Sequence, residues 1–225
     1  MPSRTLQGTP ASPGLAGGVA RILRAAVEDD RTVAPGERPS ELLRAREALT
    51  RAASELGEMG QRLRAEHRDE EAEIIETGVL FALDPSLTDE VEAAITERGM
   101  HAAAALVAAA ENQAEVIAAI DDELLAARAA DIRSLGQRAA RLVDEAPATV
   151  LGDAGTDTVL VAMDLGPADV AELSPDVRAI ALAAGGATAH AAIVARSLGL
   201  PMVVGAGSDL LALLDGAELV VDGTT

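Results

Sequence analysis

The spacing of apolar residues in the middle of the chain differs from that at its two ends. In the first part of the segment from 34 to 146, leucines recur every seven residues, and alanine or methionine fills the alternate apolar positions. A seven-residue apolar repeat predicts a long helix that packs against other helices. The positions of this repeat are Leu42, Ala45, Leu49, Ala52, Leu56, Met59 and Leu63.

Three further helical stretches are expected in the same segment. The second helix covers about 69–83 and should stop near Pro85, because proline disfavours helical backbone in the residue before it. Ser86 begins an approximate capping pattern for a third, short helix that ends near Gly99. From 101 to 144, apolar residues recur at steps of three and four, which predicts a fourth helical stretch. The segment is therefore expected to form a bundle of about four helices.

Short apolar runs separated by glycine and proline occupy the two ends of the chain. These runs have the length of strands, and strands that alternate with helices indicate an α/β layer. The sequence predicts one discontinuous α/β domain, residues 1–33 and 147–225, interrupted by a helical domain at 34–146. The expected strands are 19–23, 159–163, 177–182, 201–204 and 219–221, and the expected short helices are 167–173 and 190–198.

Composition narrows the possible partners and cofactors. Phe81 is the only aromatic residue among 225, so the core must consist of Ala, Leu, Val and Ile. The net charge of −19 argues against nucleic acid, whose binding needs Lys and Arg to neutralise phosphates, and suits a basic protein partner. The chain has no cysteine, and no pair of histidine or acidic residues has convincing metal spacing, so no metal is expected.

The sequence shows no signal for secretion or membrane insertion. The amino terminus lacks the apolar stretch of a signal peptide, and no apolar run approaches the roughly 20 residues needed to span a membrane. We therefore expect a cytoplasmic protein that does not bind membranes.

The segment 184–196 carries the chemistry. Gly185 and Gly186 follow a predicted strand and allow the backbone to turn tightly. Thr188 is placed to cap the next helix, which leaves His190 in the first turn, where backbone N–H groups and the helix dipole favour a phosphoryl group. Imidazole can attack phosphorus and then give the group away. Taken alone, however, one histidine near a helix start is more often a cap or a surface residue.

The whole string resembles the phosphorylation-site signature of phosphoenolpyruvate-utilising enzymes. The matching residues are Gly185, Gly186, Thr188, His190, the small residues 191–192, the aliphatic residues 193–194, Ala195 and Arg196. Three other segments, 11–20, 128–136 and 197–205, resemble parts of one member family. The chain is thus similar to the amino-terminal phosphohistidine half of Enzyme I of the bacterial phosphoenolpyruvate:sugar phosphotransferase system, which has a swivelling α/β domain with an inserted helical bundle.

The resemblance implies a reaction. Phosphoenolpyruvate phosphorylates His190, at Nε2 by resemblance, and His190 passes the group to the phosphocarrier HPr. Backbone amides between Gly185 and Ala191, including those of Thr188 and Ala189, would stabilise the transferring oxygens. The family's phosphoenolpyruvate and Mg²⁺ site lies on a carboxy-terminal barrel, which we expect to be absent from this chain. The fragment is then expected to be a monomer that exchanges phosphoryl groups with HPr only, whereas the full-length enzyme would be a Mg²⁺-dependent homodimer.

The resemblance also implies an HPr-binding surface on the helical domain. From the residues alone, an acidic rim around apolar side chains suits a basic partner. The other interpretation is a solvated acidic face, with Leu80 and Phe81 in the core. The residues that correspond to the HPr contacts are Glu70, Glu71, Glu76, Gly78, Leu80, Phe81, Leu87 and Arg128.

Some positions depart from the family pattern. Ala187 and Ala189 stand where many relatives have Arg and Ser, and Gly166 stands where some have a Thr that holds the active imidazole. We expect Arg196 to form a structural ion pair. We also expect Asp131 and Arg133 to tie the bundle to the α/β domain. His67 and His101 are expected to be surface residues.

Two other functions remain open. The helical bundle could be a non-enzymatic interaction module in which His190 is idle. Alternatively, the chain could be the phosphohistidine domain of a dikinase or of an enzyme like phosphoenolpyruvate synthase, although those families lack the helical insertion.

Overall fold

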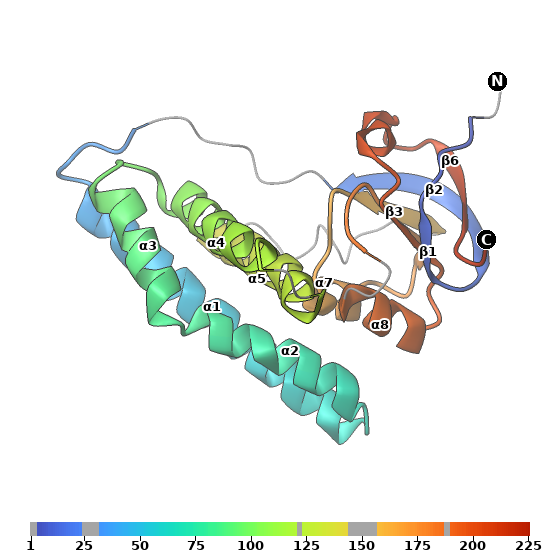
Figure 1. Ribbon diagram of the computed structural model, residues 1–225, viewed down its shortest axis with the longest axis horizontal. Helices are drawn as coiled ribbons and strands as arrows, with labels where there is room; N and C mark the ends of the chain where they lie inside the picture. Colours follow the sequence, from blue (N-terminus) through green and yellow to red (C-terminus); the bar gives the residue numbers. More distant parts are fainter. Residues whose placement is uncertain (1–3, 24–31, 121–122, 144–156, 187–189) are drawn as a thin grey trace. The chain divides into compact units, whose positions relative to one another are not determined.

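The chain forms two compact units in a computed structural model (Figure 1). The α/β unit combines the two ends of the chain, Met1–Ala25 and Ala148–Thr225, and the helical unit is Ala26–Pro147. The structure describes residues 4–23, 32–120, 123–143, 157–186 and 190–225, without the side chains of 123–127.

The helical unit contains five helices within the described residues. The long first helix packs on each of the others, and the last two pack closely on each other. The stretch expected as one helix from 101 to 144 is in fact two helices, so the unit has five where the sequence indicated about four. The helices are α1 (Arg38–Ala65), α2 (Asp69–Ala82), α3 (Pro85–Thr96), α4 (Ala102–Ala118) and α5 (Glu123–Val143).

The seven-residue repeat forms the buried face of α1. Of its positions, Leu42 is half-buried and the others are buried. Between α4 and α5 the backbones approach closely, because a Cβ added to Gly136 would lie 2.4 Å from the Cβ of Ala110. The scarcity of large side chains thus leads to tight helix contacts.

The start of α3 corrects the predicted cap. Asp84, not Ser86, is the N-cap: its Oδ1 accepts hydrogen bonds from the Ser86 backbone N–H at 2.8 Å and from the Ser86 hydroxyl at 2.7 Å. Pro85 occupies the first helical position, where its missing N–H has no cost. A carboxylate there also complements the helix dipole.

The α/β unit is built on one six-stranded sheet, in the order β1-β5-β4-β3-β2-β6. The four central strands run parallel, and β1 and β6 pair antiparallel at the two edges. The strands are β1 (Thr9–Ser12), β2 (Leu15–Leu23), β3 (Thr158–Ala162), β4 (Val177–Leu182), β5 (Met202–Val204) and β6 (Glu218–Asp222).

Both faces of this sheet are covered by apolar packing. Helices α7 (Pro167–Ala171) and α8 (His190–Ser197) lie on one face, and the 3₁₀ helix η1 (Ser208–Ala212) lies on the other (Figure 1). All five residues of β3 are buried, as a central strand between two covered faces requires. The predicted α/β class is confirmed, and β1 and η1 are additions that the sequence pattern did not indicate.

Candidate functional site

The carboxyl ends of the parallel strands meet at one edge of the sheet. The segment after β4 is hydrogen-bonded there on both sides: Ala184 N–H donates to Met163 O at 2.9 Å, and Gly205 N–H donates to Ala184 O at 3.0 Å. Such an edge is the usual place for ligands in open α/β sheets. The backbone that enters the histidine loop is therefore fixed by both neighbouring strands.

Gly185 makes the turn that follows. Its φ is +88°, a left-handed conformation that glycine adopts without strain. A Cβ at this position would lie 3.4 Å from Oδ1 of Asp164, whose carboxylate also accepts the N–H of Leu165 at 2.9 Å. Gly185 and Gly186 are both exposed. The turn is thus exposed to solvent, and the backbone that leads into it is fixed by hydrogen bonds.

His190 is the first residue of α8 and is half-buried. The next turn of α8 packs into the core of the α/β unit, with Ala191, Ala192, Val194 and Ala195 buried. The imidazole therefore stands at the start of a helix whose body is anchored in the core. Ala187, Thr188 and Ala189 lie outside the described residues, and so does the predicted cap by Thr188.

Gly166 is the N-cap of α7 and is buried. The carboxylate of Asp169, only 3% exposed, accepts the N–H of Gly166 at 3.2 Å. Glycine offers no hydroxyl here, so a hydrogen bond from this side chain to the imidazole is impossible. Sequence reasoning did not single out Asp164, which closely follows β3, or Asp169, which lies in the first turn of α7.

Metal binding can be tested within the described part of the chain. No group of three or more His, Asp or Glu side chains there is arranged to hold a metal ion. These residues do not fit a Mg²⁺ site, and no chemical step is assigned to a metal here.

Two of the predicted partner contacts, Glu71 and Leu87, are buried in this structure. Leu87 is 1% exposed, in the first turn of α3, and belongs to the core of the helical unit. Glu71 is 8% exposed, and its carboxylate lies 3.2 Å from Nε of Arg68. Both side chains face inward because α2 and α3 pack on α1. Neither can belong to an exposed contact surface in this conformation.

The other predicted contacts differ in how accessible they are. Glu70 and Leu80 are exposed, Leu80 by 70%, and Phe81 is half-buried. Glu76 accepts a hydrogen bond from Nε of Arg64 at 3.0 Å, and this bond lowers the pKa of the Glu76 carboxyl. Gly78 is half-buried on α2, and Arg128 on α5 pairs with Asp131 at 3.5 Å.

Leu83, 62% exposed directly after α2, was missed by sequence reasoning. The signal available was an apolar residue at a helix end just before Asp84-Pro85. It lies near Leu80 in sequence and adds to the apolar surface at the end of α2.

Arg133 and His101 have charged partners inside the helical unit. Arg133 pairs with Glu111 of α4 at 2.9 Å, so the contact that the structure shows for it lies within the bundle. His67 is exposed between α1 and α2, as expected. His101 is the N-cap of α4 and lies 3.7 Å from the carboxylate of Glu41, so it is more than a surface residue.

Comparison with known proteins agrees with this architecture. Residues 7–128 match the family model of the PEP-utilising enzyme, N-terminal, and residues 154–225 match that of the PEP-utilising enzyme, mobile domain. Phosphoenolpyruvate-protein phosphotransferase of Haemophilus influenzae is 30% identical over 96% of this chain and 38% of the relative. The multiphosphoryl transfer protein of Xanthomonas campestris is 34% identical over 97% of this chain and 26% of its own length. The chain thus spans well under half of these curated relatives.

Solved structures are similar over nearly the entire chain. An NMR solution structure of an Enzyme I protein is 31% identical, with a TM-score of 0.62, and 97% of this chain and 90% of that one are covered. A structure described as the N-terminal domain of Enzyme 1 – Nitrogen is 30% identical, with a TM-score of 0.63 and the same coverage. Among the described helices, none is long and apolar enough to cross a membrane. The chain therefore belongs to the family of PEP-utilising enzymes, in which its sequence and fold match the amino-terminal domain of Enzyme I.

Proposed function

We propose that this chain is a phosphoryl-transfer domain in which His190 accepts a phosphoryl group and exchanges it with the phosphocarrier HPr. The observation that carries the proposal is the place of His190. It is the first residue of α8 and comes four residues after Gly186, on the segment that follows the parallel strand β4. The first turn of a helix offers unpaired N–H groups and a positive dipole end to an anion.

We propose an in-line transfer between the imidazole ring of His190 and the phosphorylated histidine of HPr, which is the donor in the exchange. A ring nitrogen of His190 forms the new N–P bond while the N–P bond on the donor histidine breaks. The other nitrogen of the His190 ring loses its proton, and the donor ring gains one, so that charge and protons balance. The protein has to place the two rings and stabilise the phosphoryl oxygens, and it supplies no further reactant.

In the whole protein, the proposed donor is phosphoenolpyruvate. Curated relatives that are longer than this chain carry the name phosphoenolpyruvate-protein phosphotransferase. We assign the phosphoenolpyruvate site and the need for Mg²⁺ to a carboxy-terminal barrel in the full-length enzyme. For the 225 residues considered alone, the proposal is a monomer limited to reversible exchange with HPr. A cytoplasmic location stays a prediction.

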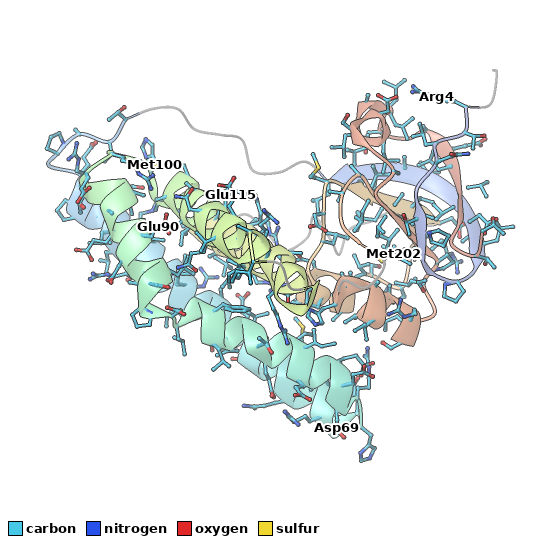
Figure 2. The ribbon with its side chains drawn as sticks, viewed as in Figure 1. Arg4, Asp69, Glu90, Met100, Glu115 and Met202 are labelled. Atoms are coloured by element: carbon cyan, nitrogen blue, oxygen red, sulfur yellow. The ribbon has the colours of Figure 1, made fainter. Side chains whose placement is uncertain are left out.

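The proposed HPr surface is the exposed face of α2 and its carboxyl end. Glu70, Glu73 and Leu80 are spaced by three and seven residues, which places them on one face of the helix, and all three are exposed. Asp69 begins the same helix (Figure 2), and Leu83 follows it. An acidic row that leads to exposed leucines fits a basic partner with an apolar centre.

The test is exposure of the chain to phosphorylated HPr, followed by intact-mass measurement. The chain has three histidines, so the matched controls are His67→Ala and His101→Ala beside His190→Ala. We expect one added phosphoryl group that is stable in base and labile in acid. It should be absent only in His190→Ala.

Each other outcome selects an alternative. HPr binding without transfer would favour a non-enzymatic interaction module. Neither binding nor transfer would favour the phosphohistidine domain of a dikinase-like enzyme. Label on His67 or His101 would overturn the assignment of the nucleophile.

A further inference from the structure

The edge strand β1 contains an irregularity that faces the histidine helix. In its pairing with β5, Pro10 is opposite Val203 and Ser12 is opposite Met202, so the register skips Ala11. The extra residue of such a bulge leaves the regular ladder and can direct its backbone groups elsewhere. Ala11 is buried, and its carbonyl accepts a hydrogen bond from Nη1 of Arg196 at 2.6 Å.

Arg196 lies in the last turn of α8. Just beyond it, Gly199 adopts a φ of +66°, and the N–H of Leu200 returns to the carbonyl of Ala195 at 2.9 Å. Together with the N–H of Gly199, which donates to the carbonyl of Arg196 at 3.1 Å, this bond closes the helix as a Schellman motif, and the chain then enters β5 at Met202. The carboxyl end of α8 is therefore held by the chain itself on one side and by the arginine bond to β1 on the other.

The buried face of α8 does little to fix the orientation of the helix. Of its four buried residues, Ala191, Ala192 and Ala195 are alanines and only Val194 is larger. Alanine side chains make few dispersion contacts and do not interlock as larger ones do. A charge-assisted hydrogen bond to a carbonyl has a defined direction, so the Arg196 bond supplies what the packing lacks.

Because of the distance along the helix, a small tilt at the anchored end of α8 would displace His190 and change the rate of transfer. Arg196 is six residues after His190, which is about 9 Å at 1.5 Å per residue. A tilt of about 6° at the anchored end then moves His190 by about 1 Å, and a misplacement of that size can cost about a hundredfold in rate. This effect on the rate does not require direct contact between the guanidinium of Arg196 and a phosphoryl group on His190.

We infer that Arg196 is a positioning residue for His190, acting through its bond to the Ala11 carbonyl; the inference rests on the proposed phosphoryl transfer. Its role differs from the ion pair that the sequence suggested, because the acceptor that the structure shows is a backbone oxygen on another strand. The bulge in β1 provides that acceptor.

The test compares Arg196→Ala with Arg178→Ala in single-turnover exchange with phosphorylated HPr. Arg178 is the matched control, because it is an exposed arginine of the same sheet that pairs with Asp157 at 2.8 Å. We expect Arg196→Ala to lower the maximal rate about ten- to a hundredfold while the half-saturating HPr concentration stays constant. Arg178→Ala should stay within about twofold of wild type, since it is outside the site.

A lysine variant separates positioning from stability alone. Arg196→Lys keeps a charged donor and should recover part of the rate, whereas Arg196→Gln should not. If Arg196→Ala does not fold, the comparison of these two variants decides. Rates that follow only the folded fraction, measured by circular dichroism in the same buffer, would overturn the inference.

The failure of this inference is distinguishable from that of the proposed function. A wild-type chain that takes no phosphoryl group would overturn the proposed function. A wild-type chain that exchanges normally, together with an Arg196→Ala variant of equal rate, would overturn only the role of Arg196.

Discussion

The helical unit and the α/β unit both have apolar cores, but they differ in where their ion pairs lie. In the helical unit, charged side chains link one helix to another, as in the ion pair of Arg46 with Glu92 at 2.6 Å and that of Arg138 with Glu55 at 3.5 Å. In the α/β unit, buried apolar strands and backbone hydrogen bonds dominate. Its ion pairs Arg4–Asp209, Arg21–Asp215 and Arg178–Asp157 leave more than half of each side chain exposed.

This difference matches the proposed division between partner binding by the helical unit and phosphoryl transfer by the α/β unit. A surface made of charged helices can change its residues without moving the backbone, which suits a partner-binding face. The histidine turn instead depends on backbone positions fixed by β3 and β5, and on the left-handed φ of +88° at Gly185. Substitutions should therefore act on stability through core and charge in the helical unit, and through backbone space in the α/β unit.

The largest expected effect is in the helical core. Leu87→Ala removes a side chain that is 1% exposed, and the cavity left behind should reduce the free energy of unfolding by about 3–4 kcal/mol. Hydrogen exchange read by mass spectrometry, which reports on the two units separately, should show faster exchange in α1, α3 and α4. The α/β unit should stay protected.

Leu80→Ala is the matched control on the same unit. Leu80 is 70% exposed, so its loss should change stability by less than about 0.5 kcal/mol while it weakens HPr binding. A Leu87→Ala variant as stable as wild type would contradict the assignment of Leu87 to the core.

A smaller loss is expected in the α/β unit from Gly223→Ala. A Cβ at Gly223 would lie 2.0 Å from the backbone oxygen of Ser12 and 3.1 Å from backbone atoms of Met202. Overpacking of this kind costs about 2–3 kcal/mol, because the edge strand β6 can yield only partly. Gly17→Ala, whose Cβ would meet its neighbours at 3.5 Å, should be far milder in the same denaturant titration.

Local sequence patterns predicted the helices and strands that are determined by their own residues. The seven-residue repeat predicted α1, and the central strands followed from short apolar runs. The strand β1 was not predicted, because its sequence includes Pro10 and has no apolar alternation; it is defined by pairing with β5, far along the chain. The break between α4 and α5 was also missed, since no glycine or proline marks the end of α4 at Ala118.

The site was predictable in its local part only. Gly185 and His190 belong to one short segment, and their order in sequence already indicates a turn into a helix. Which side of a helix is buried depends on tertiary packing, so the burial of Glu71 and Leu87 could not be predicted from the sequence. For Glu71, the spacing of three residues from Arg68 was a signal for the ion pair that the structure shows.

A third prediction concerns the buried carboxylate of Glu41. It accepts the N–H of Ala102 at the start of α4 and Nη1 of Arg44, both at 2.7 Å, and Arg44 also donates to the carbonyl of Val143 at 3.2 Å. Glu41→Gln should cost about 2 kcal/mol, because it removes charge-assisted bonds that join α1, α4 and α5. Chemical denaturation at neutral pH measures the loss.

The same variant tests a pH dependence. Burial alone would raise the pKa of Glu41, but the hydrogen bonds from Ala102 and Arg44 together lower it below its usual value of 4.5. The stabilisation is therefore present above the unfolded-state pKa and is lost as the pH falls through the lower folded-state pKa. The stability difference between wild type and Glu41→Gln should therefore shrink as the pH falls below 4.5. A difference that stays constant with pH would contradict the ionised role of Glu41.

The smallest expected effect is at Glu76, and it sharpens the boundary of the proposed HPr surface. Gly60 leaves room for the Glu76 side chain on α1, since a Cβ there would lie 2.6 Å from Cγ of Glu76, and the carboxylate is held by Arg64. The pair is partly exposed, so Glu76→Gln should cause only a slight loss of stability that fades in about 0.5 M salt. Because its charge is already balanced by Arg64, Glu76→Gln should leave HPr affinity unchanged. Glu70→Gln should weaken HPr binding without making the affinity more dependent on salt concentration. Equal loss of affinity in the two variants, measured by calorimetry, would place Glu76 back on the contact surface and mean that Arg64 releases it when HPr binds.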